Sequence, residues 1–183
     1  MKITILNFSG RVEGNCSQIA KVLENEFKEQ EVNRINFGET NIFSCSNCNY
    51  ECFKNRNECP YIIDETVDIY NKIIDSDLVY YIIPNYCGYP CSNFFVFNER
   101  GCSFYAGDKE LMNKYLNINK KFIVVSNSNN DSFRNILMNH TIMNPDILFL
   151  STRKYNQNSI AGTLMNDKQA KQDVIQFTQY MFA

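Results

Sequence analysis

Four cysteines lie within fifteen residues and form the densest group of reactive side chains in the sequence. Their spacing is Cys45-x2-Cys48-x3-Cys52-x6-Cys59. Four thiolates this close in sequence can converge on one centre, as they do in iron-sulfur clusters and in structural zinc sites. The spacing therefore predicts a metal site formed by these four cysteines, holding either a 4Fe-4S cluster or zinc.

The same spacing leaves a purely structural alternative. Cys45, Cys48 and Cys52 are spaced i, i+3 and i+7, so they could also pack as small apolar side chains along one helix face.

The apolar run at the amino terminus is too short for a signal peptide, which indicates a cytoplasmic protein. In a reducing cytoplasm, metal binding or redox chemistry explains eight cysteines better than a disulfide scaffold does.

The composition fits one folded domain and argues against two classes of partner. The chain has 183 residues, 44% of them hydrophobic, and a chain of this length can bury one sizeable core. The net charge is only -2 and the lysines and arginines are scattered, so we expect neither a nucleic-acid partner nor a membrane partner. We expect a single domain over residues 1–183, with a cysteine-rich insertion at about 43–62.

Apolar runs alternate with amphipathic helical patterns along the chain. Continuously apolar runs are typical of strands buried on both faces of a parallel sheet. Four such runs lie at 3–6, 78–83, 122–125 and 147–150, and a weaker strand pattern lies at 32–37. Helical patterns lie at 19–27, 67–74, 133–137 and 170–181. The alternation predicts an α/β fold with a doubly wound five-stranded parallel sheet and helices on both faces.

The loop after the first strand has the composition of a phosphate site. It contains the hydroxyls of Ser9 and Ser17, the guanidinium of Arg11 and the amide of Asn15, and it leads directly into a helix. Together with free backbone N–H groups at the helix start, these groups can bind a dianion, and Gly14 allows close backbone approach. The loop lacks both the G-x-G-x-x-G of dinucleotide folds and the Gly-Lys-Ser/Thr of nucleotide triphosphatases.

Two further loops lie at the carboxyl ends of strands, where ligands bind in such sheets. The third strand is followed by Pro84-Asn85-Tyr86-Cys87-Gly88-Tyr89-Pro90-Cys91, a turn whose backbone could edge a flat aromatic ligand. The fourth strand ends in Ser126-Asn127-Ser128, which can present amides and carbonyls to the same ligand before a helix opening near Asp131. A phosphate site at the first loop and a site for an aromatic ring between the other two loops together indicate FMN as the ligand.

At this point the sequence resembles the flavodoxin-like NAD(P)H-dependent FMN reductases and, within them, the iron-sulfur flavoprotein branch. The resemblance is carried by four segments: Ser9 to Ser17, the four cysteines followed by Asp64, Pro84-Asn85-Tyr86, and Phe97-Asn98-Glu99-Arg100, which looks like the family's Phe-x-Asp/Asn-Arg. The chain departs from that branch by one extra residue before Cys52 and by serines and asparagines, where glycines are frequent, at Ser126.

The resemblance implies a flavodoxin-like fold with strand order 2-1-3-4-5 that holds FMN noncovalently. It further implies electron transfer from NAD(P)H to a small-molecule or protein acceptor, in a homodimer or homotetramer. No catalytic residue is expected, because the cofactor performs the chemistry. The residues expected to bind the cofactor are Ser9, Arg11, Gly14, Asn15, Cys16, Ser17, Pro84, Asn85, Tyr86, Cys87, Gly88, Ser126, Asn127 and Ser128.

Several remaining side chains are expected to pack rather than react. Small apolar packing is the expectation for the thiols of Cys16, Cys87, Cys91 and Cys102. His140 continues the apolar stripe of one helix, so we expect it in or near the core. The aromatic residues Phe94, Phe95, Phe97, Phe104 and Tyr105 fit either the core or a subunit interface.

Three functions are thus open at the level of the sequence. The first is an FMN-dependent NAD(P)H oxidoreductase, in which the strand-end loops bind the flavin. The second is an iron-sulfur flavoprotein electron carrier, in which the four cysteines hold a cluster that relays single electrons. The third is a nonenzymatic binding domain in which the same cysteines hold structural zinc.

Overall fold

The computed structural model describes residues 1–127, 134–142 and 144–179 and centres on a parallel sheet in the order β2-β1-β3-β5-β6. The strands are β1 (Lys2–Asn7), β2 (Glu31–Asn36), β3 (Leu78–Tyr86), β5 (Asn119–Ser126) and β6 (Asp146–Ser151). A short strand, β4 (Tyr89–Pro90), pairs antiparallel with the end of β3. Because β4 lies off this path, the order equals the predicted 2-1-3-4-5, and the predicted α/β fold is confirmed.

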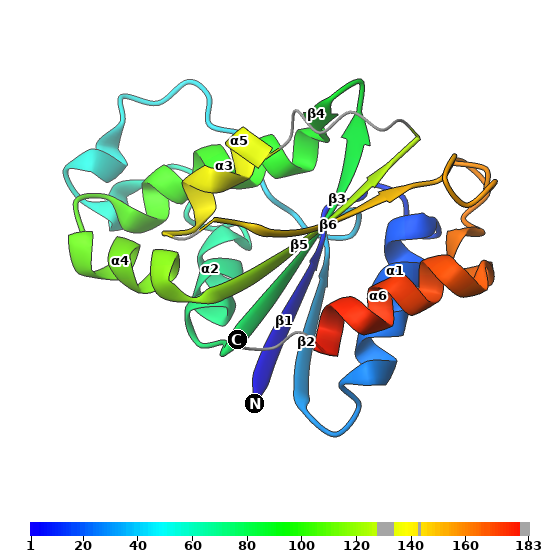
Figure 1. Ribbon diagram of the computed structural model, residues 1–183. Coiled ribbons are helices and arrows are strands. Elements are labelled where there is room, and N and C mark those ends of the chain that lie inside the picture. Colours follow the sequence, from blue (N-terminus) through cyan, green and yellow to red (C-terminus); the bar gives the residue numbers. More distant parts are fainter. Residues whose placement is uncertain (128–133, 143, 180–183) are drawn as a thin grey trace.

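Helices cover both faces of the sheet (Figure 1). One face carries α1 (Asn15–Glu26) and α6 (Lys168–Gln179). The other carries α2 (Thr66–Ile74), α3 (Ser92–Tyr105), α4 (Lys109–Asn117) and the short α5 (Arg134–Leu137). Short 3-10 helices lie at Glu51–Phe53, Arg56–Glu58, Met138–His140 and Leu164–Asn166. Within the described residues, no helix is long and apolar enough to cross a membrane.

Two apolar cores explain why the strand sequences do not alternate. Ile5 and Tyr80 pack on the side of α1 and α6, whereas Leu6 and Tyr81 pack on the side of α2 and α3. All four side chains are fully buried. Since successive residues of a strand point to opposite faces, a strand covered on both faces favours apolar residues at consecutive positions.

One element differs from its predicted form. Strand β3 continues through Pro84 to Tyr86 and turns only at Cys87 and Gly88, whose φ angles are 54° and 89°. Positive φ at both central residues is the requirement of a tight type I′ hairpin turn, which explains the abrupt reversal into β4. The helix predicted at 133–137 is found over its described residues as α5, and Phe133 and Asp131 lie outside the described residues.

The aromatic cluster belongs mainly to the core. Phe94, Phe97 and Phe104 are buried, while Phe95 is exposed. The core interpretation therefore holds for most of the cluster, and only Phe95 presents a large exposed apolar surface on this part of α3.

His140 is buried, as predicted. Its Nδ1 lies 2.8 Å from the hydroxyl of Tyr115, which in turn lies 2.9 Å from the hydroxyl of Tyr81. Burial, and then the charge of Lys120, lower the pKa of His140 to about 4. The imidazole is therefore neutral near pH 7 and serves as a hydrogen-bonding member of the core.

Candidate functional site: a strand-end cleft and a thiol pocket

A cleft of about 230 Å³ opens at the carboxyl ends of the strands; we call it the strand-end cleft. It lies where the chain leaves β1, β3, β5 and β6, and it includes the point where the strand order reverses between β1 and β3. It is lined by Ser9, Arg11, Gly14, Asn15, Cys16, Pro84, Asn85, Tyr86, Cys87, Val125, Ser126, Asn127, Thr152, Ser159 and Ile160.

The three loops selected from the sequence therefore meet at one place. Ser17 and Gly88 lie behind the wall instead of lining it: Ser17 Oγ donates to the Arg11 carbonyl at 3.2 Å, and the Gly88 N–H donates to Asn85 Oδ1 at 2.8 Å. Ser128 lies outside the described residues. Which of these residues touch a ligand stays a prediction.

One end of the cleft lies at the start of a helix, where an anion can bind. Helix α1 begins at Asn15, and the first N–H to bond back along the helix is that of Gln18, which donates to the Gly14 carbonyl at 3.0 Å. The preceding N–H groups have no partner inside the helix and point out of its positive end. The Ser9 hydroxyl accepts from the Arg11 N–H at 3.1 Å, which fixes the turn that precedes this end.

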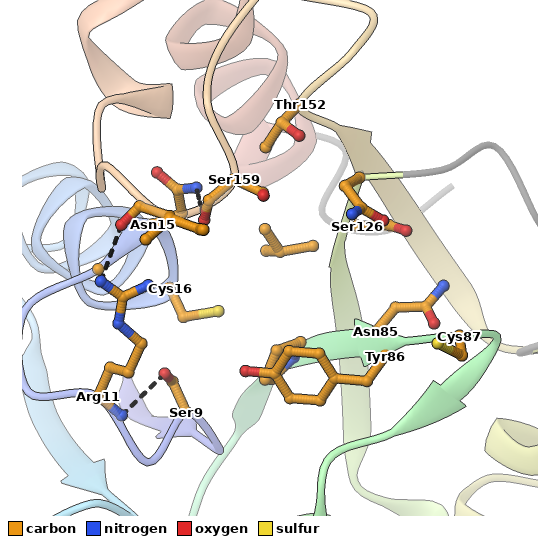
Figure 2. A pocket seen from close by; sticks show the side chains of 15 residues that line it. Ser9, Arg11, Asn15, Cys16, Asn85, Tyr86, Cys87, Ser126, Thr152 and Ser159 are labelled. Carbon is orange, nitrogen blue, oxygen red and sulfur yellow. Dashed lines mark hydrogen bonds between the residues drawn. The ribbon is translucent and has the colours of Figure 1, made fainter.

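Two side chains expected at the phosphate make other contacts. Arg11 Nη2 donates to the Ile160 carbonyl at 2.8 Å, and Asn15 Nδ2 donates to the Ser159 carbonyl at 3.2 Å (Figure 2). Asn15 Oδ1 also accepts from the Leu164 N–H at 3.0 Å. The Asn15 amide therefore holds the segment after β6, and the sequence analysis missed that segment as part of the site.

Of the residues that this missed segment adds to the cleft, only Thr152 could have been predicted from the sequence. Thr152 comes two residues after the apolar run at 147–150 and directly after β6, so the rule that selected the other strand-end loops would also have selected it. Ser159 and Ile160 lie further along an irregular segment and reach the cleft only because the chain folds back onto Arg11 and Asn15.

The thiols at the cleft differ in environment. Cys16 and Cys91 are buried, as expected for small packed side chains, and Cys91 Sγ donates to the Phe8 carbonyl at 3.2 Å. Burial, and then the neighbouring Cys91, raise the pKa of Cys16 to about 12, so this thiol stays neutral and does not repel an anion. Cys87 is exposed at the rim, so the packing expectation is wrong for it. The reason is the hairpin turn, which places Cys87 at a position with positive φ.

The other end of the cleft holds an unpaired polar atom. Asn85 is 5% exposed, and its Nδ2 has no hydrogen-bond partner among the described residues. A buried donor left without a partner costs about 1–3 kcal/mol. Figure 2 shows Asn85 near Ser126, across the cleft from Ser9 and Arg11. An anion site at one end and a polar wall at the other fit a flavin mononucleotide, with its phosphate at the first and its ring at the second.

A second cavity, of about 190 Å³, is lined by cysteines and lies between the cysteine-rich insertion and α3; we call it the thiol pocket. It is lined by Cys45, Cys48, Tyr50, Glu51, Cys52, Phe53, Cys59, Pro60, Tyr61, Glu99, Cys102 and Ser103. The four cysteines of the motif thus face one cavity. Cys45 and Cys48 lie outside any helix, so the alternative of a shared helix face is wrong. Cys102, expected to pack, is exposed and joins them from α3.

The insertion is fastened to α3 by the segment Phe97-Asn98-Glu99-Arg100. Arg100 Nη2 lies 3.2 Å from Asp64 Oδ1 and donates to the Tyr61 carbonyl at 3.0 Å. Both charged side chains are fully buried. Glu99 Oε1 accepts from the Cys45 N–H at 2.8 Å. These contacts place the first cysteine of the motif beside the helix that carries Cys102.

The thiol pocket has the donor chemistry of a soft-metal site without a closed arrangement. Thiolates suit zinc and iron-sulfur clusters. Among the residues that the structure describes, no group of three or more His, Cys, Asp or Glu side chains is arranged to hold a metal ion. Burial raises the pKa of Cys45 to about 11, against the lowering effect of Arg100, so its thiol is protonated near pH 7. The metal-site prediction stays a prediction.

Comparison with known proteins shows the fold. No protein-family profile and no curated protein matches the sequence. Among solved structures, a putative quinone reductase from Klebsiella pneumoniae superimposes with a TM-score of 0.71 at 10% identity, over 98% of this chain and 84% of that one. An FMN-dependent NADH-azoreductase from Bacillus anthracis, in complex with FMN, gives a TM-score of 0.65 at 10% identity, over 98% of this chain and 99% of that one.

A third structure carries a flavin derivative. RosB with bound 8-demethyl-8-formylriboflavin-5'-phosphate gives a TM-score of 0.67 at 14% identity, over 98% of this chain and 76% of that one. The expected resemblance to flavodoxin-like reductases is thus found at the level of the fold. Sequence identities this low carry no residue-by-residue assignment.

Proposed function

We propose that this protein is an FMN-dependent oxidoreductase that passes electrons from NAD(P)H to a small-molecule or protein acceptor. The observation that carries the proposal is the strand-end cleft, with an anion site at the start of α1 and a wall formed by the ends of β3 and β5. Likeness in fold to a quinone reductase and to an FMN-bound azoreductase supports it. When bound, FMN supplies the hydride and single-electron chemistry.

The residues of this chain would bind and orient that cofactor. The free N–H groups at the start of α1 and the charge of Arg11 would hold the phosphate. Pro84, Asn85 and Tyr86, at the end of β3, would flank the ring from one side, and Ser126 and Asn127, at the end of β5, from the other. No side chain is required to move a proton for hydride transfer, so we assign no catalytic residue.

The test begins with protein purified without air and titrated with FMN. We expect a two-banded flavin spectrum after gel filtration, followed by oxidation of NADH or NADPH in the presence of a quinone, an azo dye or ferricyanide. Flavin-loaded protein that oxidises neither nucleotide with any acceptor would contradict the proposed reaction. We also propose that the protein is a homodimer or homotetramer, and the gel-filtration volume of the same sample tests this. Cell fractionation tests the proposed cytoplasmic location.

A second candidate function is an iron-sulfur flavoprotein electron carrier. The observation that favours it is the convergence of Cys45, Cys48, Cys52 and Cys59 on the thiol pocket. Iron and labile sulfide, together with a broad brown absorbance, would support a 4Fe-4S cluster in the anaerobic protein. Bound zinc without flavin uptake would favour a zinc-stabilised binding domain instead. Flavin with neither metal would leave the plain reductase.

A further inference from the structure

The thiol pocket holds one cysteine more than the four of the motif. Cys102 lies on α3, whereas the motif cysteines lie in the cysteine-rich insertion. The 3-10 helix Glu51–Phe53, which carries Cys52, packs against α3, and this packing brings Cys102 to the same cavity. Tetrahedral thiolate sites take four sulfurs. Five thiols around one cavity therefore raise the question of which four would bind a metal.

Cys45 attaches the insertion to α3. Its N–H donates to Glu99 Oε1 at 2.8 Å, and its Sγ donates to the Glu99 carbonyl at 3.9 Å, a weak hydrogen bond. A thiol that donates its proton to a carbonyl is not a metal ligand, because metals bind the thiolate. These contacts give Cys45 a role in fastening the insertion, and they leave Cys48, Cys52 and Cys59 as the motif thiols for a metal.

The other thiols gather around Cys52. Burial, and then the thiols of Cys59, Cys48 and Cys102, raise the pKa of Cys52. Because the effect of a charge falls with distance, these three thiols lie within electrostatic reach of Cys52. All four side chains line the same cavity. Three motif cysteines together with Cys102 therefore supply the number of donors that a closed thiolate site needs.

A buried cation lies beside this group of thiols. Arg100 precedes Cys102 by two residues in α3 and is fully buried. Its contacts with Tyr61 and Asp64 are both made by Nη2, while Nε and Nη1 have no hydrogen-bond partner among the described residues. A divalent ion bound by four thiolates is an anionic centre, and a neighbouring guanidinium stabilises such a centre. The unpaired donors of Arg100 thus favour an anionic centre in this pocket.

The sulfurs are not arranged as a finished site. Among the residues that the structure describes, no three His, Cys, Asp or Glu side chains are grouped around one ion position. Cys102 is held by α3, so closure requires the insertion to move toward it. The insertion can adjust, because its regular structure in the described part of the chain is two 3-10 helices of three residues each.

We propose that Cys48, Cys52, Cys59 and Cys102 bind a thiophilic metal ion, and that Cys45 fastens the insertion without binding the metal. This inference rests on the proposed metal site of the second candidate function and does not depend on the flavin. It assigns a ligand from α3, outside the cysteine motif, and takes one motif cysteine out of the ligand set.

The experiment titrates the full chain, reduced and kept without air, with cobalt(II) as a spectroscopic probe. Charge-transfer absorbance from thiolate to cobalt reports the number of bound sulfurs, and competition with zinc gives the affinity. Cys102→Ser should lose about one quarter of this absorbance, because one of four thiolates is gone. Its affinity should fall more than about 100-fold, since loss of an outer-shell partner alone costs about 10- to 100-fold.

Two further variants complete the titration. Cys45→Ser should keep the spectrum of four bound thiolates. Cys87→Ser, which removes an exposed cysteine outside the pocket, is the matched control and should bind cobalt as the wild type does. The wild type also gives a readout that needs no substitution. Cys45 and Cys102 are both exposed, so zinc should protect Cys102 from alkylation by iodoacetamide and leave Cys45 reactive.

The outcomes separate this inference from the proposals on which it rests. Full absorbance and affinity in Cys102→Ser, or protection of Cys45 in place of Cys102, would overturn the assignment. Equal losses in Cys45→Ser and Cys102→Ser would overturn the exclusion of Cys45. A wild type that binds neither cobalt nor zinc would overturn both this inference and the metal site. Flavin titration of the same protein tests the oxidoreductase separately.

Discussion

The strand-end cleft and the thiol pocket are positioned in different ways. The cleft is made from residues at the ends of four parallel strands, whose register is set by main-chain hydrogen bonds continuous with the core. The thiol pocket is made from an insertion whose regular structure, within the described residues, is two three-residue 3-10 helices. Its place depends on side-chain contacts, chiefly Arg100 with Asp64 and Glu99 with Cys45. The sheet thus positions one site through its backbone, whereas the position of the insertion depends on a few side-chain contacts, of which the Arg100–Asp64 pair is buried.

The largest effect is expected from breaking the buried ion pair. Arg100→Met should destabilise the protein by about 3–5 kcal/mol, because it leaves the Asp64 carboxylate buried without its partner. Urea unfolding measures the loss. Affinity for FMN in the surviving native protein should stay within about threefold, since no atom of this pair lines the cleft.

The control for this prediction removes both charges together. The double variant Arg100→Met with Asp64→Asn should recover part of the lost stability, because no unpaired charge remains in the core and an amide oxygen can still accept from the Thr66 N–H. A single variant as stable as the wild type would show that the insertion is held in some other way, and the contrast between the two regions would fail.

A smaller loss is expected from crowding the phosphate loop. A Cβ at Gly38 would lie 2.9 Å from the carbonyl oxygen of Gly10 and 3.0 Å from the carbonyl carbon of Gly10. Both are backbone atoms, so they cannot rotate away. Gly38→Ala should therefore cost about 1–3 kcal/mol in stability and weaken FMN binding. Thermal unfolding and flavin titration measure the two effects. Gly10→Ala, whose Cβ meets only Asn93 Nδ2 at 3.7 Å, is the matched control and should be tolerated better.

A change in ligand affinity without a comparable change in stability is expected at Arg11. Arg11→Met removes a cation beside the proposed phosphate site and should raise the dissociation constant for FMN about tenfold. Riboflavin, which lacks the phosphate, should bind both proteins equally. An equal loss of affinity for FMN and for riboflavin would mean that Arg11 shapes the cleft without contacting the phosphate. The phosphate site would then lie elsewhere.

The mildest test compares thiol reactivity in the two regions. Because burial raises the pKa of Cys45 to about 11, its alkylation rate in metal-free protein should rise about tenfold per pH unit from pH 7 to 9 without reaching a plateau. Mass spectrometry of peptides after timed iodoacetamide treatment measures this. Cys16, buried beside the cleft with a pKa of about 12, should stay unmodified in the native protein. A plateau for Cys45 near pH 8 would show that its thiolate is more stable than a pKa of about 11 allows.

Much of the fold could be predicted from local sequence. Four apolar runs and the weaker pattern at 32–37 predicted the five parallel strands within a few residues, because strands covered on both faces favour continuous apolar stretches. Three of the loops that meet at the cleft followed from the rule that ligands bind at the carboxyl ends of strands. The helix predicted at 133–137 is also found over its described residues, as the turn α5.

Local sequence patterns were enough to predict the strands, the loops that share an edge of the sheet, and the four cysteines that are close enough to converge. The folded chain was needed to show that Cys102 joins those cysteines, that Arg100 pairs with Asp64 across 36 residues, and that Arg11 binds Ile160 across 149. Periodicity and turn chemistry act only over a few neighbouring residues. Contacts between distant side chains depend on how helices and irregular segments pack against the finished sheet.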